Sequence, residues 1–162
     1  MYKVAIITAS DKGYAGERED KSGSVIEEIV TAHELEVTGK VILPDDRQML
    51  SDQMLNYCHQ GIDLILTTGG TGFSKRDVTP EATADIVERR ADNLTFAMIA
   101  NSLQYTPKAM LSRGIAGIRE NTLIVNLPGS PKAVRENLEY AIDAIIHGVK
   151  ILKGDDAECA RK

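Results

Sequence analysis

The sequence predicts a single-domain α/β protein, a three-layer sandwich in which helices flank a mostly parallel central sheet. Short segments of the chain are apolar almost throughout, and strands of that kind need cover on both faces, as in parallel sheets between helical layers. Segments with apolar residues at helical spacing alternate with them, and no repeat or low-complexity linker interrupts the pattern. The 162 residues are enough for one domain that needs no disulfide or metal to stabilise it.

The first part of the chain predicts three strands and two helices. We expect strands over residues 3–9, 35–43 and 62–67. The sequence Ser-Val-Ile-Glu at residues 24–27 has the form of a capping box and predicts the start of a helix between the first two strands. A second helix precedes Gly61, which we expect to end it as a C-cap glycine.

The rest of the chain predicts a helical region, a fourth clear strand and a long helix. Thr79-Pro80-Glu81 combines an N-cap, a proline at the first helical position and an acid in the first turn, so we expect helices over about 80–90 and 93–105. Residues 109–119 are ambiguous and fit at most a short irregular strand. A strand over 122–127 then leads to Ser130-Pro131, which cap a helix with an apolar face. We expect a domain over residues 1–153 and a frayed polar tail over 154–162.

Composition and charge exclude several classes of protein. The formal net charge is -5, aromatic residues make up 4% of the chain, and there is no Trp. Single-stranded nucleic acids need aromatic platforms and duplexes need clustered basic residues, so we expect no nucleic-acid partner. Residues 100–140 contain five basic and three acidic side chains and the remainder is acidic. A locally basic surface of this kind suits a small anionic ligand.

Cysteines, histidines and apolar runs give no sign of a disulfide framework, a zinc site or a membrane span. Cys58 and Cys159 are far apart in the sequence, and the three histidines lack the spacing of metal ligands. The first strand is too short for a secretory signal, and no run approaches the roughly 18 apolar residues of a spanning helix. We therefore expect a cytoplasmic protein that does not bind membranes.

Polar and glycine-rich segments stand at the carboxyl ends of the predicted strands. They are residues 8–11, 44–46, 67–72 and 126–131. In open α/β sheets, ligands bind beyond this edge, near the point where the strand order reverses. We therefore expect the functional site there.

The segment over residues 67–72 contains three threonines and three glycines, so its backbone N–H groups can converge on phosphate oxygens. The alternative is a tight turn between strand and helix that binds nothing. Ser74 stands where a Walker A loop would have its second glycine, and Lys75 stands where a dinucleotide-binding loop would have its last one. Both familiar nucleotide motifs are therefore excluded.

Charged residues near this loop indicate phosphorus chemistry at a metal. Lys75 and Arg76 can supply positive charge to phosphates, and Asp77 is a hard oxygen ligand of the kind Mg²⁺ prefers. Asp45 or Asp46 can supply a second carboxylate. We expect Asp46 to be a helix N-cap, whereas Asp45 has no evident structural role. Such sites act mainly by positioning and charge neutralisation.

The motif TTGGTG at residues 67–72, followed by RDVTPEAT at residues 76–83, closely resembles the signature of the MogA/MoaB-type molybdopterin adenylyltransferase family, which acts in molybdenum cofactor biosynthesis and includes the G domain of gephyrin. The likeness covers nearly the whole chain and also includes Ser112-Arg113. Two positions depart from the pattern. Phe73 stands where several relatives have Pro or Leu, and Lys75 is often Arg in relatives.

The resemblance implies an adenylyl transfer. In this family the terminal phosphate of molybdopterin attacks the α-phosphate of ATP, pyrophosphate leaves, and the adenylylated pterin passes to a molybdenum-insertion enzyme. By matching position, Asp45 and Asp77 are the catalytic carboxylates and the ligands of Mg²⁺. The resemblance places Asn126, Pro128 and Gly129 beside the adenylate, and Ser10, Asp11 and Ser112 in the pterin pocket. The full set of implied substrate-binding residues is Ser10, Asp11, Thr68, Gly69, Gly70, Thr71, Gly72, Lys75, Arg76, Ser112, Asn126, Pro128, Gly129 and Ser130.

The resemblance also implies a homotrimer or a hexamer. Two other functions remain open at this point. The first is a molybdopterin-binding or carrier module without catalysis, against which the retention of both Asp45 and Asp77 weighs. The second is a structural oligomer without a small ligand, which would leave the acids and the basic pair at the strand ends unexplained.

Overall fold

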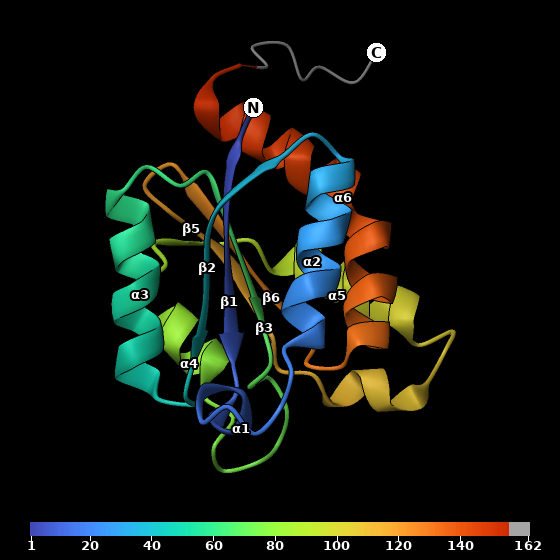
Figure 1. Cartoon of the computed structure of the whole chain (residues 1–162). Helices are drawn as coiled ribbons and strands as arrows, with labels where there is room; N and C mark the ends of the chain where they lie inside the picture. The colour runs from blue at the N-terminus through green and yellow to red at the C-terminus, as the bar shows by residue number, and fades with distance from the viewer. Residues whose placement is uncertain (156–162) are drawn as a thin grey trace.

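The computed structural model describes residues 1–155, in which a central six-stranded sheet lies between two helical layers (Figure 1). The strand order is β2-β1-β3-β6-β5-β4. Four strands are mutually parallel, namely β1 (Lys3–Ala9), β2 (Glu36–Leu43), β3 (Leu64–Thr68) and β6 (Thr122–Leu127). At one edge β5 (Ala116–Arg119) is antiparallel to β6, and β4 (Arg89–Arg90) is antiparallel to β5. The prediction of a three-layer α/β fold with a mostly parallel sheet is confirmed.

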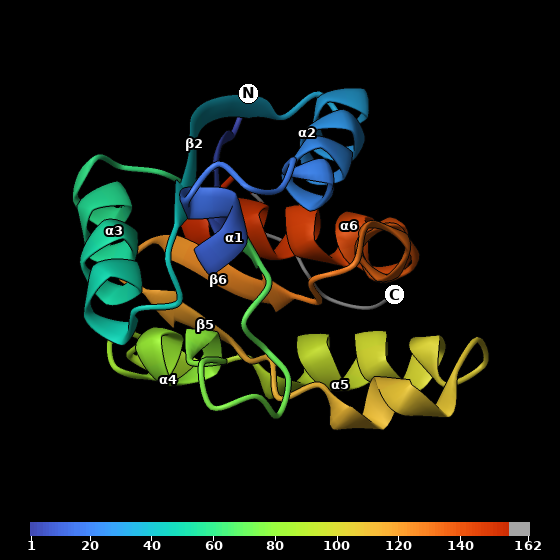
Figure 2. The same cartoon turned by 60° about the horizontal axis from the view of Figure 1, so that its bottom comes forward.

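Helices cover the two faces unequally (Figure 1). One face packs against α2 (Lys21–Ala32), α5 (Asp92–Ser102) and the long α6 (Pro131–Lys153). The other packs against α3 (Arg47–His59) and α4 (Thr79–Ala84). Two short elements, α1 (Asp11–Tyr14) and the 3-10 helix η1 (Pro107–Leu111), lie near the carboxyl ends of the strands (Figure 2).

Each central strand contributes to two separate cores because successive side chains point to opposite faces of the sheet. In β1, Val4 and Ile6 pack on the side of α2 and α6, whereas Ala5 and Ile7 pack on the side of α3 and α4. All four side chains are fully buried. Burial on both faces holds the sheet rigid, so the loops at its carboxyl edge project from a fixed frame.

The strand order reverses at β1, which pairs with β2 on one side and with β3 on the other. The loop after β1 leads to α2 on one face of the sheet, and the loop after β3 leads to α4 on the other face. A crevice therefore lies between these two loops at the carboxyl edge of the sheet. The glycine loop follows β3 directly. This arrangement confirms that the polar strand-end segments meet at one edge.

Two predicted helix starts were wrong. The helix α2 begins at Lys21 rather than at the expected capping box, because Asp20 is the N-cap and accepts a hydrogen bond from the amide of Gly23 (2.9 Å). Thr8 Oγ1 also donates to Asp20 (2.9 Å), which holds this cap against the end of β1. Thr79 is the first residue of α4 and not its N-cap, and its buried hydroxyl has no hydrogen-bond partner among residues 1–155.

The region after α4 also differs from the prediction. The helix ends at Ala84 instead of continuing to about residue 90, because residues 89 and 90 pair with β5 as an edge strand. The next helix, α5, ends at Ser102, three residues before its expected end. The ambiguous region 109–119 contains the end of η1 and the short strand β5.

Other helix ends confirm the predictions. Asp46 caps α3 by accepting from the amide of Met49 (2.8 Å), and Ser130 caps α6 by accepting from that of Ala133 (3.2 Å). Gly61 follows α3 with φ of 75°. The predicted tail lies largely in residues 156–162, outside the described residues. No helix within residues 1–155 has the length and apolar character needed to cross a membrane.

Candidate functional site

The glycine loop is shaped by close packing against its neighbours. Gly69 and Gly70 have φ of 87° and 68°, a conformation that side chains disfavour. A Cβ atom at Gly69 would lie 2.3 Å from the carbonyl oxygen of Ala9, and one at Gly70 would lie 2.3 Å from Thr79 Oγ1. The fold alone therefore requires both glycines, so the glycines by themselves do not indicate a ligand.

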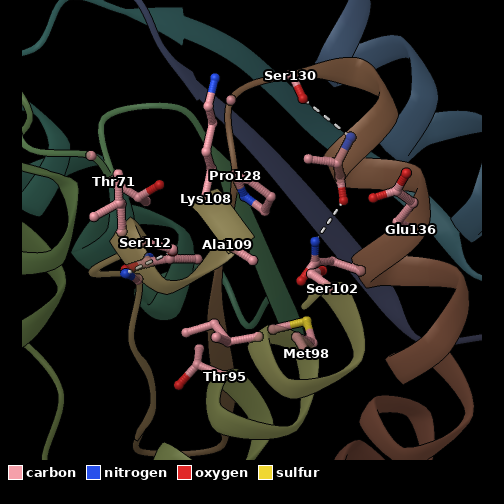
Figure 3. A pocket seen from close by; sticks show the side chains of 18 of the residues that line it. Thr71, Thr95, Met98, Ser102, Lys108, Ala109, Ser112, Pro128, Ser130 and Glu136 are labelled. Carbon is pink, nitrogen blue, oxygen red and sulfur yellow. Dashed lines mark hydrogen bonds between the residues drawn. The ribbon is translucent and has the colours of Figure 1, made fainter. Parts of the chain in front are cut away.

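Two cavities meet at this loop. The larger, of about 950 Å³, is bounded by the end of β1, by α1 and by the segment that leads to α2. The smaller, of about 470 Å³, is bounded by α5, η1 and the start of α6 (Figure 3). Gly70, Asp77, Gly129 and Ser130 line both cavities. Asp77 therefore lies in the wall that the two cavities have in common.

Asp45 is held by Asp11 in a reciprocal pair of hydrogen bonds. The amide of Asp11 donates to Asp45 Oδ2 (3.1 Å), and the amide of Asp45 donates to Asp11 Oδ1 (3.0 Å). The expectation that Asp45 has no structural role was therefore wrong. Burial raises the pKa of the Asp45 carboxyl above its ordinary value, and the negative charges of Asp11 and Asp77 raise it further.

The second carboxylate oxygen of Asp45 makes no hydrogen bond within the described residues. Asp45 Oδ1 is buried without a hydrogen bond to any described residue, and it lies 3.1 Å from the position that a Cβ atom of Gly70 would occupy. A buried carboxylate oxygen without a partner is costly unless a cation or a donor satisfies it. Asp77 lines the same cavity and accepts the amide of Ser74 through Oδ2 (3.0 Å).

These two carboxylates fit Mg²⁺ shared with phosphates. In such sites the protein supplies one or two carboxylates, and the substrate phosphates and water complete the coordination. Within the described part of the chain, no group of three or more His, Cys, Asp or Glu side chains is arranged to hold a metal.

The chain matches a known protein family over most of its length. Residues 5–147 match MoCF_biosynth, which is described as a probable molybdopterin binding domain. The match covers most of the chain. The chain belongs to this family.

Individual relatives support the assignment to MoCF_biosynth. Gephyrin from Dictyostelium discoideum is 41% identical over 159 residues, which cover 92% of this chain and 22% of gephyrin, so the chain spans about a fifth of that relative. Molybdopterin adenylyltransferase from Helicobacter pylori strain J99 is 38% identical over 155 residues, which cover 94% of this chain and 88% of the relative. The crystal structure of the molybdopterin biosynthesis enzyme MoaB from Thermus thermophilus matches with a TM-score of 0.90 and 42% identity, covering 95% of this chain and 98% of that one. These likenesses support a role in molybdenum cofactor biosynthesis.

The residues that the resemblance to the MogA/MoaB-type family implied lie around the two cavities, with one exception. Lys75 is exposed and lines neither cavity. The larger cavity is lined by Ser10, Asp11, Asp45, Thr68, Gly69, Gly70, Arg76, Asp77, Gly129 and Ser130. The smaller one is lined by Gly70, Thr71, Gly72, Asp77, Ser112, Asn126, Pro128, Gly129 and Ser130. The structure therefore separates Ser112 from Ser10 and Asp11, which were expected to share the pterin pocket.

Arg76 and Asn126 already have partners within the chain. Arg76 donates two hydrogen bonds to Asp11 (3.0 and 2.8 Å), and this pairing lowers the pKa of Asp11. The buried amide of Asn126 donates to Thr67 Oγ1 (2.9 Å) and Thr83 Oγ1 (3.0 Å) and accepts from the amide of Ile115 (3.1 Å). Asn126 therefore forms part of the cavity wall while its polar atoms hold β6 to its surroundings.

Three cations in the larger cavity were missed by the sequence analysis. Lys12, Arg18 and Lys21 line this cavity and are exposed, and none belongs to an ion pair formed within residues 1–155. They come from α1, from the start of α2 and from the segment between them. Their proximity to Ser10 and Asp11 in the sequence was the available signal. They stand beside Glu19 and Asp20 in the lining, and their amines and guanidinium can pair with phosphate groups of a ligand.

Proposed function

We propose that this protein is a molybdopterin adenylyltransferase, which transfers AMP from ATP to the terminal phosphate of molybdopterin and releases pyrophosphate. The observation that carries the proposal is the presence of Asp77 in the wall common to two cavities. Transfer between two substrates needs a place for each and a junction at which the reacting atoms meet. Both volumes fall in the range of ordinary ligand pockets.

The linings suggest how the substrates divide the space. The smaller cavity offers apolar side chains of α5 and η1, including Met98, Ile99 and Leu111, against which a flat adenine ring can pack. The larger cavity has the exposed cations Lys12, Arg18 and Lys21 and suits the pterin together with phosphate groups. We therefore assign adenosine to the smaller cavity and molybdopterin to the larger one, with the phosphates at Asp77.

In the reaction, an oxygen of the pterin phosphate forms a bond to the α-phosphorus of ATP, and the bond from that phosphorus to the bridging oxygen breaks with pyrophosphate as the leaving group. Asp45 and Asp77 would hold Mg²⁺, which when bound would neutralise charge on the phosphate oxygens. The N-cap of α6, Ser130, lines both cavities, so the N-terminal dipole of this helix favours anionic groups there. Positioning and charge account for the catalysis, as is usual for phosphoryl-group transfer.

Purified protein incubated with ATP, molybdopterin and MgCl₂ tests this proposal through the release of pyrophosphate and the mass of the adenylylated pterin. We expect turnover that requires Mg²⁺, and we expect Asp77→Asn to reduce it at least about 100-fold with unchanged circular dichroism. Asp85→Asn, on the surface outside both cavities, is the matched control. Pterin binding without pyrophosphate release would support the carrier module instead.

We also propose a homotrimer or a hexamer that hands its product to a molybdenum-insertion enzyme. Support for self-association comes from large apolar side chains exposed on α5, η1 and the segment between them. Phe96 is 72% exposed, Tyr105 57% and Met110 63%. They come from neighbouring segments of the chain, and large exposed apolar areas are typical of interfaces. Light scattering after size-exclusion chromatography would test it, with Phe96→Ser and Met110→Ser expected to shift the protein toward the monomer.

A further inference from the structure

The segment over residues 70–77 carries Asp77 and forms the wall between the two cavities. Apart from the two hydrogen bonds from Arg76 to Asp11, its side chains make few contacts with the rest of the chain. The side chains of Phe73, Ser74, Lys75 and Arg76 are exposed. Within the segment, the amide of Asp77 donates to the carbonyl of Ser74 (3.0 Å), and the amide of Ser74 donates to Asp77 Oδ2 (3.0 Å). Segments with so little apolar burial open easily unless another group holds them.

Arg113, from a distant part of the chain, makes hydrogen bonds that fix this segment. Its Nε donates to the carbonyl of Gly72 (2.8 Å), and its Nη2 donates to the carbonyl of Asp77 (2.8 Å). Its backbone amide donates to the carbonyl of Thr71 (2.8 Å), and its Nη1 pairs with the carboxylate of Glu81 at the start of α4. One residue therefore contacts the segment at both ends and ties it to α4.

We propose that Arg113 is a positioning residue for the adenylyl transfer, holding residues 71–77 so that the Asp77 carboxylate stays between the two cavities. The inference rests on the proposed function. Arg113 bonds to the carbonyl of Asp77 itself, so a shift of the guanidinium moves the residue that carries the carboxylate. Displacement of a catalytic group by about 1 Å can reduce turnover about 100-fold.

Two features separate this role from direct contact with substrate. Arg113 lines neither cavity, although the loop that it holds lines both. Its positive charge is already paired with Glu81. The planar guanidinium reaches Gly72, Asp77 and Glu81 at once because its N–H groups form a rigid fork, and a lysine ammonium lacks that geometry.

Arg113→Lys tests the proposal because it keeps the charge beside Glu81 and loses the fork. The matched control is Arg47→Lys, since Arg47 makes two hydrogen bonds to Asp85 (both 2.7 Å) outside both cavities. We expect Arg113→Lys to lower kcat about 10- to 100-fold, with the KM of ATP and of molybdopterin changed less than about threefold. We expect Arg47→Lys to leave all three constants near the wild-type values.

Hydrogen exchange gives a second readout that does not depend on activity. The amides of Ser74 and Asp77 should exchange faster in free Arg113→Lys than in the wild type, and Arg47→Lys should leave them unchanged. A kcat of Arg113→Lys within about threefold of the wild type would overturn the proposal, and so would a low kcat with unchanged exchange. If the wild type releases no pyrophosphate, the proposed function fails, and the exchange rates alone decide whether Arg113 holds the segment.

Should Arg113→Lys fail to fold, the wild type still tests the contact. The Nε–H of Arg113, bonded to Gly72, should exchange slowly, and rotation of its guanidinium should be slow by NMR in comparison with the exposed Arg18. A freely rotating guanidinium would overturn the proposal. Glu81→Gln keeps the three carbonyl contacts of Arg113, so its kcat should stay within about threefold of the wild type, and a loss of about 10-fold or more would contradict the assigned role.

Discussion

Asp11 and Asp45 each donate a backbone amide to the carboxylate of the other, at 3.1 and 3.0 Å. The pair ties the segment after β1 to the segment after β2, on one side of the crevice between the loops of β1 and β3. One oxygen of Asp45 is used in this contact, and the other is buried beside Gly70 without a partner among the described residues. Asp45 therefore has a structural oxygen and an oxygen left for a ligand.

Asparagine and alanine at position 45 should separate these two roles. Asp45→Asn retains an oxygen that can accept the amide of Asp11, so we expect a melting temperature near that of the wild type and at least about a 100-fold loss of pyrophosphate release. Asp45→Ala also removes the acceptor and should lower the free energy of unfolding by about 1–2 kcal/mol. Thermal melts and turnover of both variants check this, and an active Asp45→Asn would remove Asp45 from the catalytic set.

Two glycines with positive φ offer a matched test of the glycine loop. Gly70 has φ of 68° and no room for a Cβ atom, whereas Gly16 has φ of 76° and nothing within 4 Å of that position. Gly16→Ala should lower the free energy of unfolding by about 1–2 kcal/mol, because a residue with a Cβ atom disfavours positive φ. Gly70→Ala should destabilise by clearly more, because its methyl group meets Thr79 Oγ1. Urea denaturation of both variants measures the difference, and equal losses would show that the loop has room to relax.

The cations of the larger cavity should act on substrate binding rather than on the fold. We expect Lys12→Ala, Arg18→Ala and Lys21→Ala each to raise the KM of a phosphate-bearing substrate about 3- to 10-fold, and to weaken the salt dependence of kcat/KM. Lys150→Ala, near the end of α6 and outside both cavities, is the control. Steady-state kinetics at low and high KCl, about 50 and 300 mM, would show this, and salt dependence equal to that of the wild type would contradict it.

The ion pair between Glu81 and Arg113 should make the stability of the fold depend on pH. Burial acts to raise the pKa of the Glu81 carboxyl, but the hydrogen bond and charge of Arg113 outweigh this and hold the pKa below its ordinary value. A carboxyl with a lowered pKa in the folded state stabilises the fold above its unfolded pKa and loses that contribution as the pH falls through the folded pKa.

Glu81→Gln should therefore have a lower free energy of unfolding than the wild type at pH 7. This difference between the two proteins should become smaller below about pH 4.3. Urea titrations from pH 7 to pH 3 measure this difference. Glu36→Gln serves as the control, because Glu36 is exposed at the start of β2 and forms no ion pair within residues 1–155. A difference that widens as the pH falls would contradict the assigned ion pair.

The sequence alone determined the architecture and the edge at which the site lies. Continuous apolar strands need two covered faces, and short-range signals such as Asp46 and Ser130 as helix caps depend on residues only three positions apart. The order of polar segments at the strand ends then located Asp45, Asp77 and the glycine loop together.

Only the tertiary structure decided how these groups are held and shared. The pairing of Asp11 with Asp45, the edge strand β4, and the contacts of Arg113 with Gly72 and Asp77 join residues more than 25 positions apart. Such contacts depend on which loops the packed sheet brings side by side. The local periodicity of the sequence does not determine which loops become neighbours. The tertiary structure also divided one expected site into two cavities with Asp77 between them, because α5 and η1 fold back over the start of α6 and enclose the second space.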